Sequence, residues 1–130
     1  MSVVLAPDFV LTLLDRNADG HGSAADWVLV VEEDLVTTPL ALAAIDGTAG
    51  EGAQAVRDDF ARGAYAVRWW ADALDETLTI SRRRELDLVH ASLVALAGRL
   101  RTDRIATFDP TWRTLKTPEG KPFVMLPEDA

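Results

Sequence analysis

Two carboxylates in this chain stand just beyond short apolar runs, where side chains of a sheet protein are best placed to do chemistry. Asp8 follows the run at residues 2–6, and Asp109 follows the run at residues 104–108. In open α/β sheets, ligands bind beyond the carboxyl ends of the strands, near the point where the strand order reverses. Carboxylate oxygens are also the hard ligands that Mg²⁺ and Mn²⁺ prefer. We therefore expect the functional cleft at the end of the run 104–108, next to Asp109.

Several other kinds of site are excluded by residues that the chain lacks. It has no cysteine, which removes disulfides, thiolate metal sites and cysteine nucleophiles together. Its two histidines, His21 and His90, form no HExxH zinc motif. No Gly-x-Ser-x-Gly elbow is present, and no glycine-rich loop follows the first apolar run. A serine hydrolase elbow is thus absent, and a mononucleotide or dinucleotide site is not expected.

Strand-like and helix-like segments alternate along the whole chain. Strands are expected at residues 2–6, 35–38, 64–70, 105–108 and 123–126. The clearest helix follows Val89, because apolar residues recur there at the i, i+4, i+7, i+8 and i+11 positions. Strands separated by helices predict a three-layer α/β/α fold with a mainly parallel sheet of four to five strands. At 130 residues, the chain is expected to form one domain, 1–130.

The charge balance argues against a passive, high-affinity nucleic-acid binder, because the net charge is −8. Residues 1–80 hold 14 acidic and 4 basic side chains, whereas residues 81–130 hold 7 acidic and 9 basic ones. Such asymmetry marks a polynucleotide face, a partner surface or ordinary surface variation. The arginines at 82–84 either contact phosphates or complement a helix dipole. Trp69 and Trp70 either stack on bases or belong to a core or interface.

The chain shows no targeting or membrane segment. No basic stretch followed by an apolar run opens the sequence, so no signal peptide is expected. The longest apolar stretches fall well short of the ~20 residues that span a bilayer. We therefore expect a cytoplasmic protein without membrane contact.

Read in order, several stretches resemble the PIN-domain family, which includes the VapC-type toxins of toxin–antitoxin pairs. The stretches are VVLAPD at 3–8 leading into LLDR at 13–16, LVTTPL at 35–40, LVHASLVALAGRL at 88–100, RIATFD at 104–109 and GKPFVMLP at 120–127. They cover nearly the whole chain, and only residues 47–85 are generic. The resemblance implies a single PIN-like domain over 1–130.

The resemblance also implies a chemistry, and this sequence departs from it. The family cleaves RNA with a divalent metal that about four carboxylates hold at the mouth of the sheet, where the metal activates water and neutralises developing charge. In this chain the matching positions are Ala6, Ala44, His90 and Asp109. Three of the four carboxylates are therefore replaced. We expect a degenerate site without a metal cofactor, in a protein that is catalytically inactive and acts as a binding or regulatory module.

The alternative is an active ribonuclease that uses Mg or Mn in a rewired site of Asp8, His90 and Asp109, with Asp8 and Asp109 as metal ligands and RNA as substrate. On a continuing strand Asp8 would face the same side as Ala6; otherwise it caps the following helix. His90 is a poor Mg²⁺ ligand and is expected to hydrogen-bond to Asp109, which itself could cap the turn at 109–111. Asp46 is a further candidate, although two helical residues rotate it by about 200° from position 44.

The resemblance further implies protein partners. We expect a homodimer and an antitoxin-like protein partner, with RNA as a partner only if the site is active. A third possibility is a decoy that sequesters the antitoxin of an active relative.

Overall fold

The computed structural model describes all residues 1–130 and contains one sheet of five strands, every pair of which is parallel. The strands are β1 (Ser2–Leu5), β2 (Asp34–Thr37), β3 (Ala66–Val67), β4 (Arg104–Ala106) and β5 (Val124–Leu126). Their order in the sheet is β3-β2-β1-β4-β5. The predicted parallel α/β sheet is confirmed.

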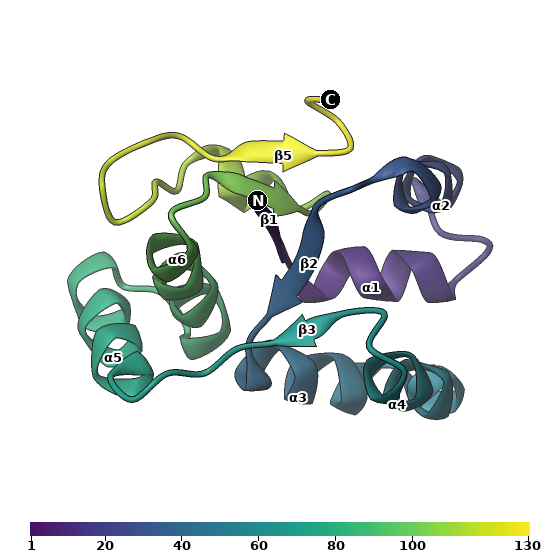
Figure 1. Cartoon of the computed structure of the whole chain (residues 1–130), viewed down its shortest axis with the longest axis horizontal. Helices are drawn as coiled ribbons and strands as arrows, with labels where there is room; N and C mark the ends of the chain where they lie inside the picture. Colours follow the sequence, from purple (N-terminus) through teal and green to yellow (C-terminus); the bar gives the residue numbers. More distant parts are fainter.

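Helices cover both faces of this sheet (Figure 1). They are α1 (Pro7–Leu14), α2 (His21–Val30), α3 (Pro39–Thr48), α4 (Ala53–Ala61), α5 (Ala73–Arg84) and α6 (Leu88–Leu100), with short 3-10 turns at Gly50–Gly52 and Pro110–Arg113. None of these helices combines the length and the hydropathy of a membrane span.

Two buried clusters form the core, one on each side of the sheet. Alternate residues of a strand point to opposite faces, and β1 follows this rule. Val4 packs with residues of α6, whereas Val3 and Leu5 pack with residues of α1 and α2. The chain is thus built in the three α/β/α layers that the sequence predicts.

The third strand is much shorter than the predicted run 64–70. Arg68 donates one more backbone hydrogen bond to Thr37, and there its neighbour β2 ends. An edge strand has nothing to pair with beyond that point, so Trp69 and Trp70 lie in the connection to α5. Trp70 packs against the core, whereas Trp69 keeps 41% of its surface exposed. The prediction of a strand through both tryptophans was wrong.

The strand order reverses between β1 and β4. Strands β2 and β3 lie on one side of β1, and β4 and β5 lie on the other. Leu5 pairs with Ala106, and the Ala6 N–H then donates to the Ala106 carbonyl over 3.1 Å. The segments that follow β1 and β4 therefore leave the sheet side by side. This is the reversal point at which ligands of open α/β sheets bind.

Candidate functional site

Asp8 ties the two segments that leave this reversal point. Helix α1 begins at Pro7, whose fixed φ suits a first helical residue, and Ala6 is the N-cap. Asp8 therefore lies inside the first turn and does not cap the helix, contrary to the N-cap reading of the sequence. Its Oδ1 accepts from the Thr107 hydroxyl over 2.6 Å, and its Oδ2 accepts from the Phe108 N–H over 2.7 Å.

Asp109 follows directly and is held by the same turn. Its N–H donates to Thr107 Oγ1 over 3.1 Å, so the Thr107 hydroxyl links Asp8 to Asp109. Oδ1 of Asp109 accepts from the Thr111 N–H over 2.9 Å and caps the 3-10 turn at Pro110–Arg113. The expectation that Asp109 caps this turn is confirmed.

His90 lies between two carboxylates at the start of α6. Its Nδ1 lies 2.8 Å from Asp87 Oδ2, and its Nε2 lies 3.4 Å from Asp109 Oδ2. Because an ionised carboxylate only accepts, a ring N–H of His90 is the donor in the 2.8 Å contact with Asp87. The contact with Asp109 is long for a hydrogen bond, but it joins the two residues as the sequence predicts. The result is a linear series, Asp87–His90–Asp109.

The pKa values of both carboxylates in this series are lowered. For Asp87, partial burial opposes the charged form, but hydrogen bonds from the His90 backbone and ring outweigh it and hold the pKa below its usual value. For Asp109, partial burial is again outweighed, here by hydrogen bonds from Thr111 and His90, and the pKa is likewise lowered. Both side chains are therefore anions at neutral pH.

Two residues that complete the site carried little signal in the sequence. Asp87 caps α6 by accepting the His90 N–H over 2.9 Å, and its place three residues before His90 is the one available clue. Trp112 is 1% exposed, and its ring stacks on His90 with centroids 5.5 Å apart. Nothing in the spacing of the sequence indicates this contact.

Ala6 and Ala44, at the two metal positions that the resemblance assigns to alanine, have no side-chain atom that could bind a metal. Ala6 is 1% exposed and belongs to the core cluster beside α6. Ala44 lies partly exposed on α3. Asp46, two residues further along, forms a two-point ion pair with Arg57 of α4. Its pKa is lowered by the hydrogen bond from that guanidinium, and its contact joins two helices.

The side chains present do not fit a divalent metal. Mg²⁺ and Mn²⁺ need several oxygen ligands that converge on one point. Asp8 already accepts hydrogen bonds at both oxygens, and the His90 ring separates Asp87 from Asp109. Nowhere in the chain do three or more His, Asp or Glu side chains gather so that they could hold a metal ion.

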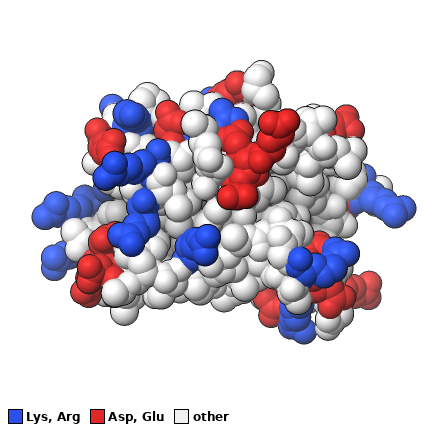
Figure 2. All heavy atoms as spheres, viewed as in Figure 1, with Lys and Arg blue, Asp and Glu red and all other residues white.

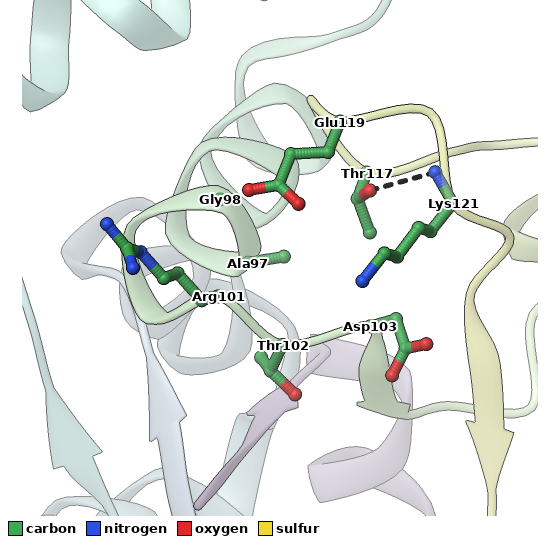
Figure 3. A pocket seen from close by; sticks show the side chains of 8 residues that line it. All are labelled: Ala97, Gly98, Arg101, Thr102, Asp103, Thr117, Glu119 and Lys121. Carbon is green, nitrogen blue, oxygen red and sulfur yellow. Dashed lines mark hydrogen bonds between the residues drawn. The ribbon is translucent and has the colours of Figure 1, made fainter.

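Charged side chains also gather in places away from the site around Asp109. In the face drawn in Figure 2, acidic side chains gather near the start of β2, and basic ones lie around α5 and α6. A cavity of about 80 Å³ lies at the C-terminal end of α6, surrounded by charged side chains of both signs (Figure 3). Since His90 is in the first turn of this 13-residue helix, the cavity is separate from the site around Asp109.

Solved structures share this fold, although the sequence matches no protein-family model and no curated protein. VapC20 of Mycobacterium tuberculosis, described as a toxin that cleaves the sarcin-ricin loop, is similar with a TM-score of 0.72 and 19% identity. That match covers 84% of this chain and 91% of VapC20. A toxin–antitoxin complex from Klebsiella pneumoniae is similar with a TM-score of 0.64 and 14% identity, over 84% of this chain and 88% of the other. The chain thus has a VapC-like PIN fold, as the resemblance predicts.

Proposed function

We propose that this protein is a PIN-fold binding or regulatory module that does not cleave RNA by a divalent-metal mechanism. The observation that carries the proposal is the series Asp87–His90–Asp109, which stands beyond β4 where a metal cluster would need free carboxylates. Ala6, at the same reversal point, is buried and has a methyl group in place of a metal-binding side chain.

The hydrogen bonding of the remaining acids supports this proposal. A metal at Asp8 would compete for its two oxygens with the hydroxyl of Thr107 and the N–H of Phe108. Each buried or partly buried donor left without an acceptor costs about 1–3 kcal/mol. His90 adds a nitrogen ligand, which suits transition metals far better than Mg²⁺. The site is therefore built as a hydrogen-bonded connection between α1, α6 and the turn after β4.

The competing hypothesis is the rewired ribonuclease with Asp8, His90 and Asp109. It would require Asp8 and Asp109, which are held by Thr107, Phe108 and Thr111, to converge on one ion. The bonds at 2.6, 2.7 and 2.9 Å that now hold these carboxylates oppose such a change.

Protein partners are the expected ligands of such a module. Leu29 and Val30, at the end of α2, keep 84% and 73% of their surfaces exposed. Adjacent exposed apolar side chains of this kind favour contact with another protein. A homodimer and an antitoxin-like protein are the two partners proposed, and the similar Klebsiella structure is of a toxin–antitoxin complex.

A cleavage assay tests the proposal. The wild-type chain and the Asp109→Ala variant are incubated with a mixed RNA pool and Mg²⁺ or Mn²⁺, with Asp26→Ala as a matched control on the exposed face of α2. All three proteins are expected to leave the RNA at the level of a chelator-treated sample. Metal-dependent cleavage that Asp109→Ala abolishes and Asp26→Ala preserves would overturn the proposal in favour of the rewired ribonuclease.

A further inference from the structure

The cavity at the C-terminal end of α6 lies between that helix and the loop 116–121 (Figure 3). Its polar lining consists of four charged side chains and two threonines: Arg101, Asp103, Glu119, Lys121, Thr102 and Thr117. Two of the charged groups are cations and two are anions, so together they carry no net charge. This balance disfavours a simple anion such as phosphate, and it equally disfavours a simple cation.

The four charged side chains have no partner in the chain. None of them forms an ion pair, and none of their charged groups makes a hydrogen bond. In Figure 3, the Lys121 ammonium group and the Glu119 carboxylate both point into the space between the helix and the loop without meeting. Opposite charges attract strongly when they pair directly. The gap between these two is therefore one that a molecule with a charge of each sign can bridge.

Thr117 supplies a further donor beside Lys121. Its side chain lines the cavity, and the residue is only 4% exposed. Its Oγ1 accepts the Lys121 N–H over 3.1 Å, but its own O–H has no acceptor in the chain. A buried hydroxyl is stabilised by an acceptor for its proton. The Thr117 hydroxyl is therefore available to an acceptor group that Lys121 attracts.

The loop that carries these groups is held firmly against α6. Arg84 donates to the carbonyls of Lys116 and Thr117, the second over 3.2 Å. A Cβ added at Gly98 would lie 2.7 Å from Pro118 Cγ, so only glycine lets the loop approach the helix this closely. The cavity is thus preorganised, which lowers the ordering cost of binding.

We propose that this cavity binds the headgroup of a free α-amino acid. The carboxylate of the amino acid pairs with Lys121, and its ammonium group pairs with Glu119 at the end of α6, where the helix dipole favours a cation. The volume of about 80 Å³ gives room for about five water-sized groups, and the headgroup of an amino acid is of that size. A free amino acid carries both charges at neutral pH, whereas a peptide terminus carries one of them.

A wider groove beside the cavity receives the side chain of the amino acid. This groove lies between α5 and α6 and shares Gly98, Arg101 and Glu119 with the cavity. It continues along Ile80 and Ala95, and its volume of about 570 Å³ is within the range of small-molecule sites, about 300–1,000 Å³. Different amino acids therefore share the headgroup contacts and differ in affinity through the groove.

The amino-acid site goes beyond the proposed function and is separate from the site around Asp109. Gly98 follows His90 by eight helical residues, which is about 12 Å along the helix axis. Amino-acid binding and RNA cleavage are measured independently and depend on different residues. Either idea can therefore fail without the other.

A titration followed by nuclear magnetic resonance tests the site. The ¹⁵N-labelled wild-type chain is titrated with each of the standard amino acids in turn. At least one is expected to cause saturable shifts of the amide signals of residues 97–103 and 117–121, with a Kd of about 1 mM or tighter. Two analogues of the tightest ligand, one without its carboxylate and one without its ammonium group, are expected to bind at least about tenfold more weakly.

Two single substitutions locate the binding. Lys121→Gln and Glu119→Gln each remove one of the pairing charges, and each is expected to weaken binding at least about tenfold. The matched controls Lys116→Gln and Glu32→Gln change the same residue types at exposed positions that do not line the cavity, and they are expected to keep the wild-type affinity. The amide spectrum of each variant also shows whether it is folded.

Four results would overturn the proposal. They are the absence of saturable binding by any amino acid, shifts confined to other parts of the wild-type chain, an affinity that survives either substitution in a folded variant, and an analogue with one charge that binds as tightly as the amino acid itself.

Discussion

The hydroxyl of Thr107 donates a 2.6 Å hydrogen bond to Oδ1 of Asp8, across 99 residues of sequence. The same hydroxyl accepts the N–H of Asp109. Through this one side chain, the first turn of α1 holds the turn after β4 in place. Asp8 is thus explained as a structural acceptor, and no metal is needed to account for its position.

Replacing Asp8 by Asn is expected to destabilise the fold. The amide oxygen can accept from only one of the two present donors, Thr107 Oγ1 or Phe108 N, and the amide NH₂ faces the other. The expected loss is about 1–3 kcal/mol in the free energy of unfolding, measured by urea denaturation. Asp26→Asn, on the exposed side of α2, is the control and is expected to change stability little. An Asp8→Asn variant as stable as wild type would contradict this role, since a free metal ligand has no bond to lose.

Acid sensitivity is expected from Asp87. Its pKa is lowered in the folded chain from a usual value of 3.8, since the bonds from His90 outweigh partial burial. At a pH between the folded and the unfolded pKa of Asp87, the unfolded chain binds more protons than the folded chain. The stabilisation of the folded chain by ionised Asp87 is therefore present above the unfolded pKa. It is lost as the pH falls through the folded pKa. Asn is as good an N-cap as Asp but does not titrate. The melting temperature of Asp87→Asn is therefore expected below that of wild type at neutral pH.

The difference in melting temperature between Asp87→Asn and wild type is expected to disappear as the pH falls from about 5 to 3. Melting curves recorded by circular dichroism across this range measure it. Asp26→Asn again serves as control, and its curve is expected to run parallel to that of wild type. A constant separation between Asp87→Asn and wild type at every pH would show that the charge of Asp87 does not contribute.

A stabilising change is expected at Thr77 in α5. Its side-chain oxygen is fully buried and has no hydrogen-bond partner. Valine has the same shape, a similar helix propensity and no hydroxyl to leave unpaired. Thr77→Val is expected to raise the free energy of unfolding by about 1 kcal/mol, as measured by urea denaturation.

Thr12→Val provides the contrast to Thr77→Val. Thr12 Oγ1 donates to the Asp8 carbonyl over 2.9 Å, so its removal is expected to destabilise the chain. If Thr77→Val instead lowered stability, the Thr77 hydroxyl would have to be satisfied in solution.

The sequence predicted the fold well because its signals are local. Apolar runs separated by amphipathic segments indicate a parallel sheet, and Thr38 before Pro39 marks the start of α3, where Thr38 accepts the Ala41 N–H. The length of the third strand depended on a distant neighbour. Its pairing ends where β2 ends at Thr37, and nothing near Trp69 encodes this limit.

The candidate site was predicted in position and only partly in its contacts. Residues after β1 and β4 do meet, because parallel strands end at one edge of the sheet. The contact of His90 with Asp109 was expected from the resemblance. The bonds from Asp8 to Thr107 and Phe108, and the stacking of Trp112 on His90, join residues far apart in the chain. Such contacts depend on tertiary packing, which no local pattern shows.

The site around Asp109 is proposed not to hold a divalent metal, and titration with Mn²⁺ measures this binding. Isothermal titration calorimetry is carried out at neutral pH on chelator-treated wild-type protein, with Asp109→Ala and Asp26→Ala beside it. No saturable binding is expected for any of the three proteins. Saturable binding of Mn²⁺ to wild type and Asp26→Ala, lost in Asp109→Ala, would contradict it.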